Sequence, residues 1–305
     1  MNSPAEDVNT QTVVVTGASS GIGRETALRY ASRGANVVLA ARSELKLHKV
    51  AAECRTAGAA DVIVLATDIA EFDQVQRLFD AAVARFGRVD IAVQCAAITA
   101  FGRFEDLPVD VFDGVVRTNI LGAANVARSA MVHFQAHEAG HLVLIGSLLG
   151  FTAAPYQSPY VVSKFALAGL VRLLRQESQH LPGIKVHGVY PGPVDTPVFG
   201  TAGNYFGRAP QVPPTAVAPG TIVAAIVRAT DGRRSSERQV GWMNRPAILA
   251  YHLIPSFYDA LIGPFLRAVA FSSSPTDSTD GNVFDAPPAA AAANQKGRPS
   301  PPASG

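Results

Sequence analysis

A glycine-rich turn close to the start of the chain constrains the fold more than any other feature. The β-branched run Thr12–Thr16 leads into it, and a helical pattern over Arg24–Arg33 follows. Glycines allow a tight turn, and a helix N-terminus offers unpaired N–H groups with positive partial charge. An ordinary strand–helix turn is the alternative, but this setting favours a pyrophosphate site formed by Gly17, Ser19, Ser20, Gly21, Ile22 and Gly23.

Short apolar runs alternate with longer helical patterns along most of the chain. The expected strands are Thr12–Thr16, Asn36–Ala41, Val62–Ala66, Val89–Val93, Leu142–Ser147, Ile184–Tyr190 and Gln239–Met243. The expected helices are Arg24–Arg33, Glu44–Thr56, Phe72–Phe86, Val111–His137, Pro159–His180 and Ala216–Ala229. Continuous apolar strands alternating with helices predict an α/β fold with a doubly wound parallel sheet.

The same patterns divide the chain into four segments. Residues 12–243 form the expected α/β domain, and residues 244–271 form an apolar appendage interrupted by prolines. Residues 272–305 are rich in Ser, Pro, Ala and Gly and are expected to be disordered, as are residues 1–11.

Composition excludes several classes of function. The 305 residues are 48% hydrophobic, and the formal net charge of +2 with no dense Lys/Arg run argues against a nucleic-acid partner. The only cysteines, Cys54 and Cys95, favour a reducing compartment, and we expect a cytoplasmic protein. Residues 1–10 do not resemble a secretory signal, and no apolar run is long enough to span a bilayer.

The end of the second expected strand indicates which nucleotide is bound. An NAD site usually places an acid about 20 residues beyond the glycines to bind the ribose 2′-hydroxyl. Here the strand ends at Ala41 and is followed by Arg42, whose planar fork of donors suits a 2′-phosphate. Arg42 could instead be an ordinary surface residue, but the missing acid favours NADP(H). Ser20 stands where a second basic residue could have been, which predicts a moderate rather than a strict preference for NADP(H).

Tyr160 and Lys164 stand four residues apart on an expected helix and therefore share a face. Ser147 precedes them at the end of an expected strand, on the edge where ligands bind. The Lys164 ammonium is expected to lower the pKa of the Tyr160 phenol, and Ser147 can donate a hydrogen bond to a substrate oxygen. This set predicts proton transfer by Tyr160 during hydride transfer.

With these motifs in order, residues 12–243 resemble the classical short-chain dehydrogenase/reductase family. The resemblance implies a Rossmann fold and a Ser147–Tyr160–Lys164 catalytic set, with Asn119 in a water-linked proton relay. It also implies that Asp68 and Ile69 lie by the adenine, and that the Pro191–Gly192 motif is followed by nicotinamide contacts from Val194 and Thr196.

One segment departs from the family pattern. The family usually carries Asn-Asn-Ala-Gly after the fourth strand, whereas this chain has Gln94, Cys95, Ala96 and Ala97. Small residues remain where the cofactor passes, so Cys95, Ala96 and Ala97 are expected to touch it. The departure bears on local strand pairing and cofactor affinity rather than on proton chemistry. Cys95 is interpreted as a small buried residue, not a nucleophile.

Other features allow two interpretations. His133, His137 and His141 have metal-like spacing, but no acidic cluster completes a site, so we expect no metal. Leu148, Leu149, Tyr156 and Phe199 suggest a bulky apolar substrate, with loop anchoring nearly as favoured for the aromatics. The apolar segment 244–271 could contact a membrane surface or a partner subunit, but packing on its own domain is preferred.

The sequence therefore predicts an NADP(H)-dependent oxidoreductase that acts on a small-molecule carbonyl or secondary alcohol. We expect a homodimer or homotetramer. A non-catalytic nucleotide-binding regulator is the alternative, and a membrane-associated or scaffolding protein built on the appendage is a third hypothesis.

Overall fold

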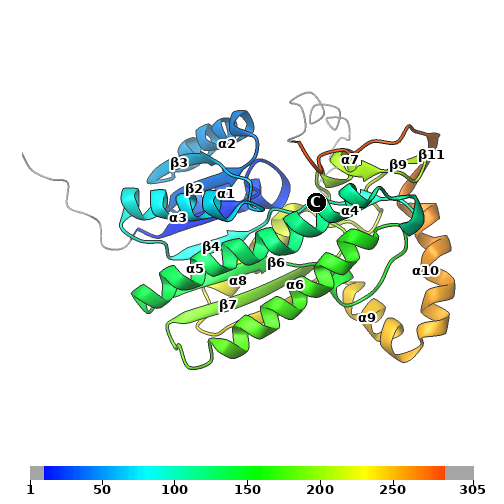
Figure 1. Cartoon of the computed structure of the whole chain (residues 1–305). Helices are drawn as coiled ribbons and strands as arrows, with labels where there is room; N and C mark the ends of the chain where they lie inside the picture. The colour runs from blue at the N-terminus through cyan, green and yellow to red at the C-terminus, as the bar shows by residue number, and fades with distance from the viewer. Residues whose placement is uncertain (1–9, 286–305) are drawn as a thin grey trace, which may run out of the picture.

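Seven parallel strands form the central sheet of the protein. The structure, a computed structural model, describes residues 10–285. The strand order is β10-β7-β6-β4-β1-β2-β3 (Figure 1). The strands are β1 Thr12–Thr16, β2 Asn36–Ala41, β3 Asp61–Ala66, β4 Ile91–Gln94, β6 Gly140–Ile145, β7 Ile184–Pro191 and β10 Ser236–Val240. Every pairing between neighbours is parallel, which confirms the expected doubly wound sheet.

Helices cover both faces of this sheet. The core on one face joins the strands to α1 Gly21–Ala31, α2 Glu44–Ala57 and α8 Pro219–Thr230. The core on the other face joins them to α3 Phe72–Phe86, α5 Ala123–His137 and α6 Ser158–Glu177 (Figure 1). The strands are buried on both faces, which explains their continuous apolar sequences.

Two strands are shifted along the chain relative to the expectation, and the ends of other strands differ by one or two residues. β6 ends at Ile145, before Gly146 and Ser147, so Ser147 lies beyond the sheet rather than within its last strand. β10 begins at Ser236 and ends at Val240, because the next residue, Gly241, has a φ of 140° that interrupts the extended backbone. Both shifts leave the expected topology intact.

The long helix expected over Val111–His137 consists of three parts. α4 spans Val109–Val116, a π-helical turn spans Arg117–Gly122, and α5 follows. The π turn contains Asn119, which is buried. Such turns often occur at functional sites.

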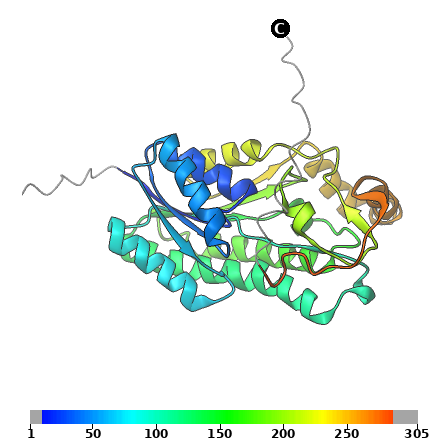
Figure 2. The same ribbon diagram turned by 90° about the horizontal axis from the view of Figure 1, so that it is seen from above.

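The segment after β10 packs beside the carboxyl end of the sheet. α9 Asn244–Leu253 and α10 Pro255–Val269 form a hairpin, and β11 Phe271–Pro275 pairs antiparallel with β9 Arg208–Pro210 (Figures 1 and 2). Two further short strands, β5 Ala100–Phe101 and β8 Gly203–Asn204, pair beside α7 Val198–Thr201. Within residues 10–285, no helix has the length and apolarity needed to cross a membrane.

The expectation of a disordered tail from Ser272 differs from the structure. Residues 272–285 continue from α10 through β11 and end in a turn whose Val283 is buried. The Ser- and Asp-rich composition concealed this, because backbone hydrogen bonds to residues 201–210 and one buried apolar side chain, Val283, hold the segment in place. Residues 286–305 and most of the expected disordered N-terminus, residues 1–9, lie outside the described residues.

Candidate active site

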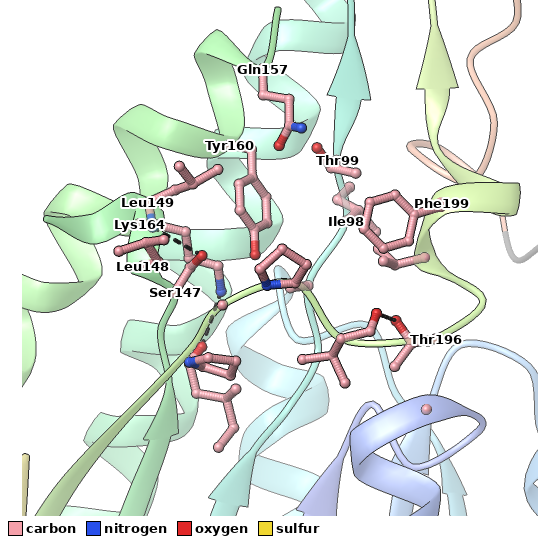
Figure 3. A pocket seen from close by; sticks show the side chains of 18 of the residues that line it. Ile98, Thr99, Ser147, Leu148, Leu149, Gln157, Tyr160, Lys164, Thr196 and Phe199 are labelled. Atoms are coloured by element: carbon pink, nitrogen blue, oxygen red, sulfur yellow. Dashed lines mark hydrogen bonds between the residues drawn. The ribbon is translucent and has the colours of Figure 1, made fainter. Parts of the chain in front are cut away.

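A cavity of about 900 Å³ opens where the carboxyl ends of the parallel strands meet. Loops after β1, β2, β3, β4, β6 and β7 line it, so it lies at the edge where doubly wound sheets bind ligands. Figure 3 shows Ser147, Tyr160 and Lys164 on one wall, with Thr196 and Phe199 across the pocket.

The glycine turn after β1 brings backbone into close contact at the floor of this cavity. Gly17 has a φ of 68°, and a Cβ atom there would lie 2.6 Å from the Ala96 backbone nitrogen. A Cβ atom on Gly23 would lie 2.2 Å from the Gly17 carbonyl oxygen. Only glycine fits either position without movement of the backbone.

The first turn of α1 is suited to an anion. Its N-cap, Ser20, makes no side-chain capping hydrogen bond, and the first turn contains no acidic residue. Ser19, Ser20, Gly21 and Ile22 all line the cavity there. Free N–H groups, positive partial charge and close backbone approach fit a dinucleotide pyrophosphate.

The residues expected at the adenosine end lie on the cavity wall. Arg42 follows β2, and Asp68 and Ile69 follow β3. Burial lowers the pKa of Arg42, while the carboxylates of Asp68 and Asp285 act in the opposite direction. The terminal nitrogens of Arg42 donate to backbone carbonyls of residues 282–284, a contact that the sequence did not indicate.

The three residues expected to act on protons come together from β6 and α6. Ser147 follows β6, and its hydroxyl accepts a hydrogen bond from the Leu149 N–H at 3.1 Å. Lys164 is buried on α6, and its Nζ donates to the Ile145 carbonyl oxygen at 3.0 Å. The same Nζ lies 5.3 Å from the centroid of the Tyr160 ring.

The pKa values of this set differ from the expectation. Burial raises the pKa of Tyr160, and its interaction with the Ser147 hydroxyl acts in the opposite direction. Burial lowers the pKa of Lys164 to about 8, opposed by Cys95. The pKa of Tyr160 therefore shifts upward, opposite to the lowering expected from Lys164, because burial disfavours the charged forms of both side chains.

Asn119 does not line the cavity but supports the loop that does. Its Oδ1 accepts from the Ile98 N–H at 2.9 Å, and its Nδ2 donates to the Ile98 carbonyl oxygen at 2.8 Å. Nδ2 also lies 3.1 Å from the Ser163 hydroxyl, which donates to the Tyr160 carbonyl oxygen at 2.8 Å. Asn119 therefore links the loop after β4 to α6, which carries Tyr160 and Lys164.

The unusual segment after β4 keeps its place under the expected cofactor. Cys95, Ala96 and Ala97 line the cavity, and Gln94 Nε2 donates to the Ala96 carbonyl oxygen at 2.7 Å. Gln94 also stays within the β1–β4 ladder. Burial raises the pKa of Cys95 to about 12, so its thiol is not activated as a nucleophile.

The loop after β7 forms the remaining wall on the cofactor side. Pro191, Gly192, Val194 and Thr196 all line the cavity. Val194 forms a parallel bridge with Val217. Thr196 lies close to Gly21, because a Cβ atom built on Gly21 would be 3.2 Å from the Thr196 Cγ2 atom. This loop thus lies directly against the glycine turn at the edge of the cavity.

The expected substrate residues divide into two groups. Leu148, Leu149 and Phe199 line the cavity. The expectation for Tyr156 is not met, because its ring packs against Phe206 and Phe271 and its hydroxyl accepts from Arg267 at 2.6 Å. Tyr156 has a φ of 72° and is not among the residues that line the cavity.

Sequence reasoning missed the contribution of the α9–α10 hairpin. Its apolar side chains close one end of the cavity, and polar Thr99 and Gln157 also line it. The prolines that interrupt the segment concealed the hairpin, and nothing local places it over the sheet. The hairpin residues lining the cavity are Pro246, Ala247, Ala250, Phe257, Tyr258, Leu261, Ile262, Pro264, Phe265 and Leu266.

The hairpin packs on its own domain through only part of its surface. The Tyr258 hydroxyl donates to the Ala153 carbonyl oxygen at 2.9 Å. Leu249 and Leu253 of α9 remain exposed and do not line the cavity.

The three histidines with metal-like spacing serve separate structural contacts. His133 Nε2 accepts from the Val89 N–H at 2.9 Å, and His137 Nδ1 contacts the His133 carbonyl oxygen. His141 instead stacks on buried His187. Among residues 10–285, no group of three or more metal-ligating side chains is assembled.

Comparison with known proteins identifies the family. The sequence profile of the short chain dehydrogenases matches residues 11–204. The chain belongs to the short-chain dehydrogenase family. This confirms the resemblance drawn from the Gly17, Tyr160 and Lys164 motifs.

Named relatives agree with this assignment. An uncharacterized oxidoreductase of Bacillus subtilis is 35% identical over 70% of this chain and 62% of its own. The 11-beta-hydroxysteroid dehydrogenase A of Arachis hypogaea is 36% identical over 68% of this chain and 58% of its own. An alcohol dehydrogenase from Thermococcus sibiricus, complexed with 5-hydroxy-NADP, has a TM-score of 0.66 and 27% identity over 76% of this chain and 97% of its own. The match thus spans about three fifths of each of these curated relatives.

Proposed function

We propose that this protein is an NADP(H)-dependent oxidoreductase that interconverts a carbonyl and a secondary alcohol on a bulky apolar substrate. The observation that carries the proposal is the convergence of Ser147, Tyr160 and Lys164 on a cavity that also contains the glycine turn. We further expect a homodimer or homotetramer in the cytoplasm.

The chemistry of the proposed reduction follows from where the protons are held. The nicotinamide, when bound, supplies the hydride that adds to the carbonyl carbon. The raised pKa of Tyr160 keeps its phenol protonated at neutral pH, which suits it to donate a proton to the forming alkoxide oxygen. Ser147 can donate a hydrogen bond to the same oxygen. Alcohol oxidation reverses these steps.

Lys164 supports the proton donor electrostatically. Its ammonium is present below about pH 8 and lies over the Tyr160 ring, where it stabilises negative charge on the phenolate after proton transfer. The Ile145 carbonyl holds the ammonium in place. Family resemblance adds a contact from Lys164 to the nicotinamide ribose.

Arg42 supports the choice of NADP(H) over NAD(H). It stands at the cavity wall after β2, where an acid would favour a free ribose hydroxyl. The Thermococcus sibiricus enzyme, which is complexed with 5-hydroxy-NADP, provides a precedent in a similar chain.

The apolar walls support a bulky hydrophobic substrate. Leu148 and Leu149 line the wall beside Tyr160, Phe199 lies across the pocket, and the α9–α10 hairpin adds Phe257 and Leu261. The Arachis hypogaea relative, named a hydroxysteroid dehydrogenase, suggests rigid polycyclic alcohols as first candidates.

The test is turnover of a panel of ketones and secondary alcohols, graded by apolar bulk, with each nicotinamide cofactor. Arg42→Ala should weaken use of NADPH by about 10- to 150-fold, since a hydrogen bond to a charged group contributes about 1.5–3 kcal/mol, and should leave NADH little changed. Arg103→Ala, at an exposed site outside the cavity, is the matched control. If no combination of substrate and cofactor is turned over although the cofactor binds, the alternative of a non-catalytic nucleotide-binding regulator is favoured. Equal loss with both cofactors would contradict the role of Arg42.

A further inference from the structure

The C-terminal segment 276–285, here called the strap, lies across the molecule from the base of α10 to the adenosine end of the cavity. Figures 1 and 2 show this red segment running back from β11 past α7. Asn282 from the strap lines the cavity itself. The strap therefore lies next to the site without containing any of the expected catalytic residues.

Backbone hydrogen bonds fix the strap along its length. The Thr276 N–H donates to the Gly207 carbonyl oxygen at 3.1 Å, and Thr279 and Asn204 exchange two bonds at 2.7 and 3.0 Å. The Asn282 N–H donates to the Thr201 carbonyl oxygen at 2.9 Å. The strap is thus hydrogen-bonded to the end of α7, the helix that contains Phe199, and to the loop that follows it.

One apolar side chain anchors the end of the strap. Val283 is 3% exposed and packs in a small core with Ile98, Leu107, Val111 and Val115. It fits against Gly114, where a Cβ atom would lie 2.7 Å from Val283 Cγ1. The turn before it depends on Gly281, which has a φ of 59° and would place a Cβ atom 2.3 Å from the Ala202 carbonyl carbon.

The anchored strap presents three carbonyl oxygens to Arg42. Nη2 donates to the Asn282 oxygen at 2.5 Å, and Nη1 donates to the Val283 and Phe284 oxygens, each at 3.2 Å. A guanidinium has five N–H donors. These bonds therefore leave Nε–H and one Nη2–H, for which the described residues provide no acceptor within hydrogen-bond distance. Two such donors suit the bidentate pairing of arginine with a phosphate.

We propose that the strap positions Arg42 for the 2′-phosphate, so that residues 281–283 determine cofactor choice without touching the cofactor's reacting atoms. The inference rests on the proposed NADP(H) function. Holding a long side chain in its binding conformation before the ligand arrives removes the entropy cost of ordering it, typically 0.5–1.5 kcal/mol per side chain. NADH has no 2′-phosphate and gains nothing from the ordered guanidinium.

The experiment compares Gly281→Ala, Val283→Asp and Val283→Ile with the unchanged full chain. Gly34→Ala is the matched control, because Gly34 has a φ of 76° with open space around its Cβ position and is far from the cavity lining. Dissociation constants for NADPH and NADH are measured by titration of cofactor fluorescence without substrate, after thermal melting confirms folding. The same variants are then made with Arg42→Ala.

Gly281→Ala and Val283→Asp should weaken NADPH binding by about 2- to 12-fold, the range that follows from that ordering cost, and leave NADH within twofold. Val283→Ile and Gly34→Ala should change neither. When Arg42→Ala is also present, loosening the strap should no longer alter the ratio of the two constants. If Val283→Asp fails to fold, Gly281→Ala carries the test.

Equal weakening of both cofactors would reduce the strap to a structural element and overturn the inference. Tighter NADPH binding by Gly281→Ala would also overturn it, because the strap carbonyls and the nearby Asp285 would then compete with the phosphate for Arg42. If Arg42→Ala alone leaves the ratio of the NADPH and NADH dissociation constants unchanged, the proposed preference for NADP(H) is wrong. If Arg42→Ala changes the ratio but the strap variants do not, only the strap inference fails.

Discussion

Replacing Asn119 with alanine should both destabilise the fold and loosen the active site. The side chain is 1% exposed and satisfies the N–H and the carbonyl of Ile98, with a third contact to Ser163. Its loss leaves two backbone groups without partners, each costing about 1–3 kcal/mol, and water from the adjoining cavity can replace part of that. We expect the free energy of unfolding to fall by about 2–4 kcal/mol.

The same change should affect catalysis through position rather than through proton donation. Ile98 and Thr99 line the cavity. Without the hydrogen bonds from Asn119, we expect their loop to move and the cavity to widen beside Tyr160. Urea unfolding followed by circular dichroism measures the stability, and steady-state kinetics measures kcat and KM. Ser163→Ala is the graded control, because it removes only one of the three Asn119 contacts and should cost about 1 kcal/mol. If Asn119→Ala lowers the free energy of unfolding no more than Ser163→Ala does and retains normal kcat, the hydrogen bonds of Asn119 to Ile98 do not hold the site in place.

Two further variants test other parts of the site. Because burial lowers the pKa of Lys164 to about 8, the unfolded chain binds more protons between pH 8 and pH 10, so stability should rise across that window by up to about 1.4 kcal/mol per pH unit. Lys164→Met should flatten this rise in urea unfolding at pH 8 and 9.5, and an unchanged slope would show that Lys164 is not the group responsible. A chain ending at Phe271 lacks the strap and its Val283 anchor, so it should bind NADPH more weakly than a chain ending at Asp285. Equal NADPH affinity for the two chains would contradict the role of the strap in cofactor binding.

The cofactor side of the site was largely predictable because its signals are local. The turn from Thr16 to Gly23 joins one strand to one helix, and the glycine requirement arises from backbone geometry within a few residues. Tyr160 and Lys164 share a helix face by spacing alone, and Ser147 lies at the strand end that faces them. The parallel sheet followed from continuous apolar strands.

The parts that were missed depend on contacts between distant segments. Val283 finds its partners in α4, more than 160 positions earlier, and no local pattern marks it as buried. Tyr156 packs against Phe206 and Phe271, which lie 50 or more positions later in the sequence, and not against the cavity. The raised pKa of Tyr160 likewise depends on burial, which side-chain spacing cannot reveal.

The claim that Tyr160 is the proton donor is tested most directly by single-turnover hydride transfer in Tyr160→Phe. The substitution removes one oxygen and keeps the ring, so the fold and NADPH affinity should match those of the unchanged protein. Hydride transfer, followed as loss of NADPH absorbance with a ketone that the unchanged protein reduces, should slow by about 10²–10⁴-fold. A rate within a few-fold of the unchanged protein would contradict the assignment of this site.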